Sequence, residues 1–242
     1  MVEVLIAGDS QTGALMHRVR RLRNVGLVAA PGKSFADIHV TDAGQVEGYK
    51  VQINCPQGAP LDRYDLVYIY GDMPEPLALI PRRAHRFSRA YLAAHVSERL
   101  HDCHSLTLAQ QVAQVLPTDR IILVPKPINL KRGANGFAEM TLAQATALIA
   151  PHIGFPIAPL KSKTCAADGT PDPACYEKSA DWQGAATDAS TQPDHDNGHL
   201  NTRGGDLVFD AFKRDVARRV IPAHENRHRS SPPAHPTPPP PL

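Results

Sequence analysis

The sequence lacks several features that mark large classes of protein. No run approaches the roughly 18 apolar residues that a transmembrane helix needs, so no membrane span is predicted. Lys and Arg (26) nearly balance Asp and Glu (24), which leaves no single-sign field to attract DNA or RNA. Aromatic residues make up only 5% of the chain, which disfavours a base-stacking platform. We therefore expect no nucleic-acid partner.

Cysteine is also scarce, and the amino terminus shows no secretory signal. Four cysteines in 242 residues are too few for a disulfide scaffold. Cys165 and Cys175 flank a polar loop and would close it if oxidised, but reduced thiols are the expected state. Residues 1–7 have the pattern of a strand, without the basic region and cleavage site of a signal peptide. These features predict a cytoplasmic protein.

Apolar runs of strand length alternate with helical patterns along the chain. Strands are predicted at residues 2–7, 66–70 and 121–124, with shorter or weaker ones at 27–28, 38–40, 51–53 and 155–160. Helices are predicted at residues 12–23, in one or two pieces over 88–116 with a break near Cys103, at 141–149 and at 206–220. This alternation predicts an α/β fold with a mostly parallel sheet covered by helices on both faces.

One domain over residues 1–221 accounts for these elements, and two segments stand apart from it. Residues 162–196 are polar, and a loop of this length is usually functional or disordered. Residues 222–242 are rich in Pro, His, Ser and Arg and have too little apolar surface to fold, so a disordered tail is predicted.

Two short motifs at opposite ends of the chain carry the strongest chemical signal. Gly8-Asp9-Ser10 lies at a predicted strand-to-helix junction, where the serine amide can stabilise a developing oxyanion. Asp196 and His199 are three residues apart, shortly before the last predicted helix. An aspartate so placed can fix the tautomer of the imidazole, which leaves the other ring nitrogen as a base for a serine hydroxyl.

This pair of motifs resembles the SGNH (GDSL) hydrolase superfamily, whose members carry Gly-Asp-Ser after the first strand and Asp-x-x-His near the C-terminus. The resemblance covers the order of elements up to about residue 220, but only these two motifs by residue. It implies a three-layer flavodoxin-like fold with Ser10 as nucleophile, His199 as base and Asp196 as orienting acid. The backbone amides of Ser10 and Gly71 would form the oxyanion hole, and no metal or organic cofactor is implied.

The sequence departs from the family pattern where further oxyanion donors are expected. The family has a glycine after its second strand, and three glycines are candidates here: Gly44, Gly48 and Gly58. It has Gly-x-Asn-Asp after its third strand, which is replaced by Gly71-Asp72-Met73-Pro74. Three asparagines elsewhere remain as substitute donors: Asn54, Asn129 and Asn135. Loss of one donor typically costs about 3 kcal/mol of transition-state stabilisation.

The leading hypothesis is a serine hydrolase that cleaves an ester of a small molecule, a lipid or a glycan through an acyl-enzyme on Ser10. Two alternatives stay open. One is an acyltransferase on the same scaffold, and the other is a non-catalytic binding protein with a degenerate oxyanion hole. No metal site is predicted, because the cluster at residues 101–104 has no second group of ligands at zinc spacing. The pattern indicates no particular oligomeric state.

Overall fold

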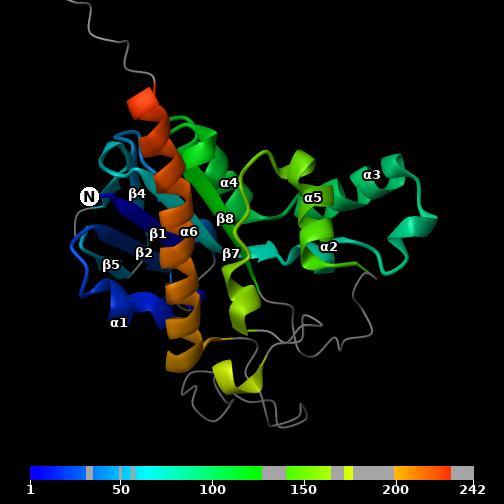
Figure 1. The fold of residues 1–242 in the computed structure, drawn as a ribbon, viewed down its shortest axis with the longest axis horizontal. Coiled ribbons are helices and arrows are strands. Elements are labelled where there is room, and N and C mark those ends of the chain that lie inside the picture. Colours follow the sequence, from blue (N-terminus) through cyan, green and yellow to red (C-terminus); the bar gives the residue numbers. More distant parts are fainter. Residues whose placement is uncertain are drawn as a thin grey trace, which may run out of the picture.

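A five-stranded sheet in the order β5-β2-β1-β7-β8 forms the centre of the molecule (Figure 1). The computed structural model describes residues 1–30, 35–48, 51–55, 58–126, 140–164, 172–176 and 199–229. The strands are β1 (Val4–Asp9), β2 (Val25–Ala30), β5 (Val51–Ile53), β7 (Leu66–Pro74) and β8 (Ile121–Lys126). β2, β1, β7 and β8 are parallel, and β5 is antiparallel to β2 at one edge. The predicted α/β class with a mostly parallel sheet is confirmed.

Alternating side chains of β1 divide the core into two layers. Leu5 and Ala7 belong to one buried cluster, and Val4 and Ile6 belong to the other. Successive side chains of a strand point to opposite faces of the sheet. A strand that is apolar at every position is therefore the expected pattern where helices cover both faces.

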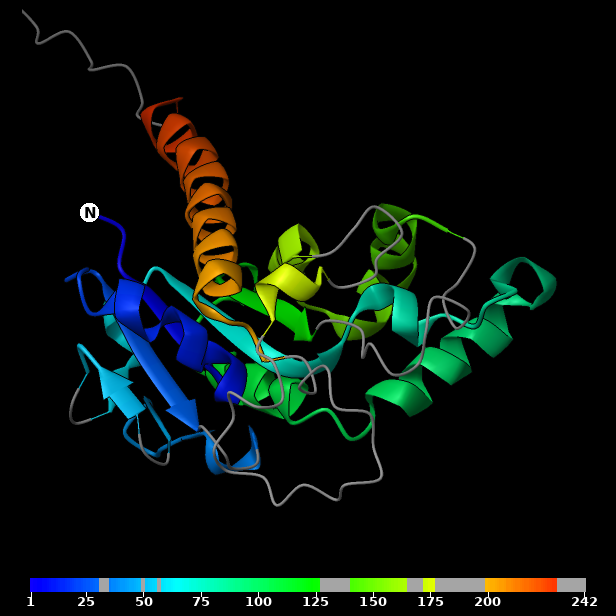
Figure 2. The same cartoon turned by 90° about the horizontal axis from the view of Figure 1, so that it is seen from below.

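The face built on Val4 and Ile6 is covered by α1 (Met16–Val19) and by the long helix α6 (Thr202–Arg229). Phe212 of α6 packs on Tyr68 of β7, with ring centroids 4.3 Å apart. The Tyr68 hydroxyl also donates a hydrogen bond to Asp215 of α6, at 2.8 Å. Figure 2 shows α6 on one side of the sheet, with its C-terminal part extending away from the strands. Among the described helices, none is both long and apolar enough to cross a membrane.

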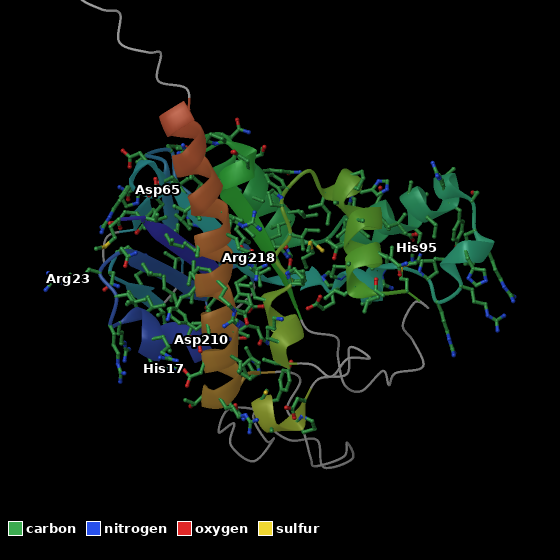
Figure 3. All side chains as sticks on the ribbon, viewed as in Figure 1. His17, Arg23, Asp65, His95, Asp210 and Arg218 are labelled. Carbon is green, nitrogen blue, oxygen red and sulfur yellow. The ribbon has the colours of Figure 1, made fainter. Side chains whose placement is uncertain are left out.

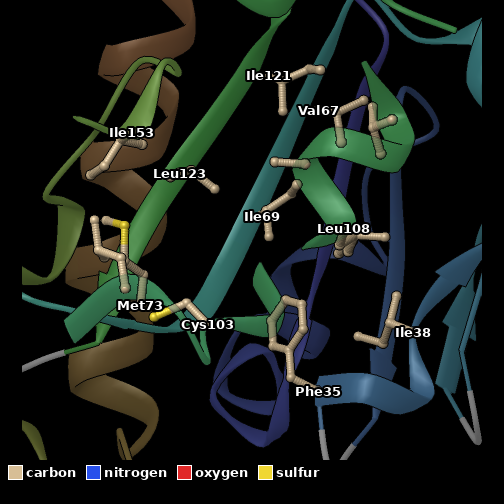
Figure 4. Close-up of a cluster of buried hydrophobic side chains, with 14 of the residues drawn as sticks. Phe35, Ile38, Val67, Ile69, Met73, Cys103, Leu108, Ile121, Leu123 and Ile153 are labelled. Carbon is tan, nitrogen blue, oxygen red and sulfur yellow. The ribbon is translucent and has the colours of Figure 1, made fainter. Parts of the chain in front are cut away.

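The opposite face is covered by helices and by a second, smaller sheet. On this face lies α4 (His104–Val112), while α2 (Pro76–Leu79), α3 (Arg89–Leu100) and α5 (Leu142–Ile153) pack on one another to one side of it (Figure 1). The small sheet consists of β3 (His39–Val40), β4 (Gln45–Glu47) and β6 (Ala59–Pro60). Leu108 of α4 packs in one cluster with Phe35 and Ile38 against Val67 and Ile69 of β7 (Figure 4). The predicted break between two helices near Cys103 is confirmed.

Short 3-10 helices complete the described elements: η1 (Ser10–Leu15), η2 (Phe35–Asp37), η3 (Leu61–Arg63), η4 (Ala84–Arg86), η5 (Thr118–Arg120), η8 (Leu160–Thr164) and η9 (Pro173–Cys175). The helix predicted at 12–23 is replaced by η1 and the single turn α1. The reason is local, because the Thr12 hydroxyl donates to the Asp9 carbonyl at 2.6 Å and so favours a tight turn.

Boundaries after residue 140 also differ from the sequence prediction. α5 includes Pro151 and ends at Gly154, whose φ of +74° is the left-handed conformation of a helix C-cap. The strand predicted at 155–160 is reduced to a single parallel bridge between Ile157 and Leu123, consistent with the two prolines that flank Ile157's segment. α6 starts at Thr202 rather than 206.

The helix α6 also continues beyond the predicted start of the disordered tail. It ends at Arg229, so residues 222–229 are helical, which corrects the prediction for that part of the tail. Extending an existing helix fixes one residue for each added hydrogen bond, and nucleation is not repeated. Residues 230–242 lie outside the described residues.

Candidate active site

The carboxyl ends of β1 and β7 form the rim at which the strand order reverses. The chain passes from β1 outward to β2 and then back across β1 to β7. In doubly wound sheets this switch point is where ligands bind. Gly8 is paired in register with Tyr70, so Ser10 and Gly71 follow neighbouring positions on two adjacent strands. Ser10 and Gly71 therefore lie at the same edge of the sheet.

Asp9 holds the turn that presents Ser10. Its buried carboxylate accepts a hydrogen bond from the backbone amide of Gln11 at 2.8 Å, as a cap of η1. Gly8 precedes it because a Cβ there would collide with the Tyr70 carbonyl oxygen and the Thr12 side chain. The Gly-Asp-Ser motif therefore has a structural reason for each of its first two residues, and leaves the Ser10 side chain at the rim.

Gly71 packs directly against the Asp9 carboxyl group. Its φ is +116°, and a Cβ at this position would lie 2.7 Å from the carboxyl carbon and both oxygens of Asp9. The register of β7 against β8 shifts between Tyr70 and Pro74, so the pairing of the two strands is irregular beside Gly71. Irregular pairing at the end of a strand redirects the chain. Only glycine fits here on both conformational and steric grounds.

The residues after Gly71 serve the fold and supply no side-chain oxyanion donor. Met73, at the place of the family's asparagine, is fully buried in a cluster with Cys103 and Ile153 (Figure 4). The Asp72 carboxylate accepts from the Ser105 amide at 3.1 Å, at the start of α4. The residues that stand where the resemblance would place Gly-x-Asn-Asp are therefore used in packing and in the connection to α4.

His199 lies within hydrogen-bonding distance of Ser10, although 189 positions separate them in the chain. The Ser10 Oγ and the His199 Nε2 are 2.8 Å apart, and the contact is partly buried. A nucleophile and a base at this separation satisfy the geometric requirement for proton transfer. Asp196, the third predicted residue, lies outside the described residues.

Asn201 anchors the segment that carries His199. Its side-chain amide donates to the carbonyls of Ala174 and Tyr176, at 3.0 and 3.1 Å. Its side-chain oxygen accepts from the Gly204 amide at 2.9 Å, which caps the start of α6. The neighbouring Leu200 is buried and forms an antiparallel bridge with Tyr176. These contacts fix the backbone on the C-terminal side of His199.

Two adjacent glycines let the first turn of α6 approach the rest of the site. A Cβ on Gly204 would collide with the Cys175 carbonyl oxygen, and one on Gly205 with the Ala14 carbonyl oxygen of η1. η1 begins with Ser10, so the contact at Gly205 brings the segment of His199 close to the segment of Ser10. Sequence reasoning missed this role, although the Gly-Gly pair at the start of a predicted helix was the available signal.

An ion-pair cluster also joins α1 to α6. The Asp206 carboxylate accepts from Arg18 Nε at 2.6 Å and lies 2.9 Å from His17 Nε2. The hydrogen bond from Arg18 lowers the pKa of Asp206 below its ordinary value. Figure 3 labels His17 on α1 and Asp210 on α6, and both lie near the N-terminal end of α6. Arg18 therefore has a structural role at the contact between these two helices.

The remaining candidate donors are placed as follows. Asn54 donates to the carbonyls of Val19, Leu22 and Val25, so it is part of the fold and is rejected as an oxyanion donor. Asn129 and Asn135 lie outside the described residues. The three candidate glycines lie in or beside the small sheet: Gly44, Gly48 and Gly58. β2 extends to Ala30, so the first glycine after it in the sequence is Gly32, which also lies outside the described residues.

The remaining features outside the Ser10–His199 pair are a cavity, candidate metal ligands and the Cys175 thiol. A cavity of about 340 Å³ lies between α1 and α6 beside Val4, at the amino end of β1, so it is not part of the rim. Over the described ranges, no three His, Cys, Asp or Glu side chains come together as metal ligands. Cys175 is a free thiol, and its predicted neighbour Cys165 is not among the described residues.

Comparison with known proteins gives a weak structural likeness. The chain is similar to the crystal structure of the lipase/acylhydrolase from Enterococcus faecalis, with a TM-score of 0.35 and 12% sequence identity, over 90% of this chain and 97% of that chain. No protein-family model matches the sequence, and no curated protein matches it. A TM-score this low does not place the two chains in one family, so the function must be argued from the site itself.

Proposed function

We propose that this protein is an acyl-ester hydrolase of the SGNH type, with Ser10 as its nucleophile. The observation that carries the proposal is the 2.8 Å distance between Ser10 Oγ and His199 Nε2 at the topological switch point. Few structural roles require a serine and a histidine from opposite ends of a chain to meet at this rim. A proton relay does require it.

In this proposal His199 accepts the serine proton at Nε2 and becomes an imidazolium. Before that transfer the neutral imidazole must carry its hydrogen on Nδ1, which needs a hydrogen-bond acceptor to hold the tautomer. Asp196 is proposed for that role because it precedes His199 by three residues. Asp9 is not proposed as the acceptor for Nδ1, because its carboxylate caps η1.

The oxyanion would be stabilised by backbone amides. Those of Ser10 and Gly71 are proposed as two donors, and the amide of Gly32, which follows β2, as a third. Met73 supplies no side-chain donor where the family has asparagine. We therefore expect a turnover rate about a hundredfold below that of an enzyme with the complete set of donors.

The proposed reaction proceeds in two balanced halves. Ser10 Oγ attacks the ester carbonyl while its proton passes to Nε2, and the tetrahedral intermediate collapses as Nε2 returns that proton to the leaving alcohol. Water then loses a proton to Nε2 and attacks the acyl-enzyme, and Ser10 regains the proton as the free acid leaves. No cofactor takes part in these steps. Small-molecule, lipid and glycan esters are the substrate classes proposed.

A fluorophosphonate probe tests this proposal, because it reacts with a serine only when a neighbouring base activates it. We expect the parent chain to be labelled, Ser10→Ala not to be labelled, and His199→Ala to be labelled about a thousandfold more slowly. Mass spectrometry of the labelled peptide should place the adduct on Ser10.

Ser97→Ala is the matched control, since Ser97 is an exposed serine on α3 and should label like the parent. Equal labelling of the parent and Ser10→Ala would reject the proposal. An unlabelled, folded parent chain would favour a non-catalytic binding protein instead.

A further inference from the structure

A strongly basic surface lies on a lobe at one end of the molecule. We define the basic lobe as residues 82–95, which comprise η4, the loop after it and the first half of α3. Figures 1 and 2 show α3 at the end of the molecule remote from α1. The lobe follows β7 in the chain, through α2, and is separate from the Ser10–His199 pair.

The basic lobe carries positive charge that no carboxylate of the described residues pairs with. It has four arginines, all exposed: Arg82, Arg83, Arg86 and Arg89. No acidic residue occurs between Glu75 and Glu98, and α5, which packs beside α3, has none over Leu142–Ile153. Within the described part of the chain, no ion pair involves any of the four. By contrast, Arg18 in the body of the protein is paired with Asp206.

The same lobe exposes two aromatic rings, and no other Phe, Tyr or Trp side chain of the described residues is exposed. Phe87 is 41% exposed and Tyr91 is 48% exposed. The two rings stack with centroids 4.6 Å apart, and Tyr91 stacks in turn with His95 at 6.1 Å. Large aromatic side chains exposed beside arginines are typical of surfaces that meet a membrane interface.

The stacking of these rings helps to decide between two anionic partners, single-stranded nucleic acid and a lipid surface. Binding single-stranded nucleic acid requires free ring faces on which bases can stack. Tyr91 already has a ring neighbour in both Phe87 and His95, so its faces are largely used within the lobe. Insertion into the headgroup region of a bilayer needs only apolar area and nearby cations. The observations therefore favour a lipid surface.

We infer that the basic lobe docks the protein on membranes that contain anionic lipids, with Phe87 and Tyr91 at the headgroup level and the four arginines on lipid phosphates. Each arginine near such a surface contributes about 1 kcal/mol, so four of them suffice for reversible peripheral binding. This inference goes beyond the proposed hydrolase activity and does not depend on it.

Vesicle co-sedimentation of the full chain tests the inference. We expect binding to vesicles of phosphatidylcholine with 40% phosphatidylserine, weak binding to pure phosphatidylcholine, and a loss of binding as salt is raised. Arg86→Ala/Arg89→Ala should weaken binding to the anionic vesicles about thirtyfold. A Phe87→Trp variant that also carries Trp182→Phe, so that residue 87 is its one tryptophan, should show a blue-shifted emission when anionic vesicles are added, which reports insertion of residue 87.

Arg20→Ala/Arg23→Ala is the matched control, because it removes the same charge from exposed positions outside the lobe. Figure 3 labels Arg23 and His95 at opposite ends of the molecule. The control should bind vesicles like the parent. Equal weakening by both double variants would overturn the inference, and so would tighter binding to a single-stranded oligonucleotide than to the anionic vesicles.

Fluorophosphonate labelling in the absence of vesicles separates this inference from the proposed function. All lobe variants should label at Ser10 at the parent rate, which also shows that they are folded. Vesicle binding by a chain that cannot be labelled would reject the hydrolase proposal and leave the docking surface standing. Labelling without vesicle binding would reject the docking surface and leave the hydrolase proposal standing.

Discussion

At the scale of single residues, the candidate site is shaped by what small side chains permit. Ser10 is presented at the rim because Gly8 leaves room for the β7 backbone and Asp9 caps the turn. Gly71 occupies a backbone conformation that other residues rarely adopt, directly against Asp9. The turn that carries the nucleophile therefore depends on a glycine of the neighbouring strand.

Gly71→Ala should damage the site and the fold together. The new Cβ would meet the Asp9 carboxylate in a conformation with φ of +116°, and strain of this kind costs about 2–4 kcal/mol. We expect a lower urea midpoint and at least a tenfold slower fluorophosphonate reaction. Gly13→Ala is the control, since a Cβ there meets nothing within 4 Å and should leave both quantities unchanged or slightly improved. A Gly71→Ala protein as stable and as reactive as the parent would contradict this account.

At the scale of secondary-structure elements, the start of α6 decides whether the two halves of the site meet. Asn201 ties this segment to η9, and the Gly204–Gly205 pair lets the helix backbone approach η9 and η1. Asp206 then binds Arg18 and His17 of α1. The distance between Ser10 and His199 is thus set by how closely one helix end packs against another.

Gly205→Ala separates this packing effect from helix propensity. Alanine in place of glycine inside a helix ordinarily stabilises by about 1 kcal/mol. Here the added Cβ would collide with the Ala14 carbonyl, so we expect destabilisation of about 1–3 kcal/mol, with Tm lower by roughly 5 °C and slower labelling of Ser10. Arg203→Ala, an exposed change in the same turn, should leave Tm and labelling nearly unchanged. An increase in Tm for Gly205→Ala would show that the close approach is unimportant.

At the scale of the whole molecule, burial on both faces of the sheet places tyrosines where they resist ionisation. Burial raises the pKa of Tyr64 to about 12, and raises those of Tyr68 and Tyr70 above the ordinary value. A tyrosine of raised pKa stabilises the fold fully below pH 10. That stability is lost as pH rises from 10 through the folded value, because only the unfolded chain then ionises. The fold should therefore weaken in alkaline solution.

Tyr64→Phe isolates the contribution of one of these groups. The Tyr64 hydroxyl is buried without a hydrogen-bond partner among the described residues, so its removal should leave stability at pH 7 unchanged or raise it by about 1–2 kcal/mol. Between pH 9 and 12 the parent should lose up to roughly 3 kcal/mol more than the variant, which corresponds to the two-unit shift. Urea unfolding across this pH range measures the difference in unfolding free energy between the two proteins. The contributions of Tyr68 and Tyr70 cancel in this difference, because both proteins contain them. Parallel curves for the two proteins would be inconsistent with this assignment.

Local patterns were sufficient to predict β1, β7 and β8, the helices on either side of Cys103, and the place of Ser10 after the first strand. They failed where side chains or neighbours compete with propensity. The helix expected at 12–23 became η1 and α1, since Asp9 and Thr12 hydrogen-bond within the turn. Asn54 was a candidate donor by residue type alone, and its three carbonyl partners come from the packed connection between α1 and β2.

The sequence by itself determined which segments become buried strands and that a serine follows the first of them, because apolar runs and capping residues act over a few neighbouring positions. Only the tertiary structure decided that Ser10 and His199 approach to 2.8 Å, that Met73 fills the core, and that four exposed arginines on one lobe have no ion-pair partner among the described residues. These features depend on the packing of α6, β7 and α3 against the rest of the chain, and contacts between residues far apart in sequence leave no periodic signal along it.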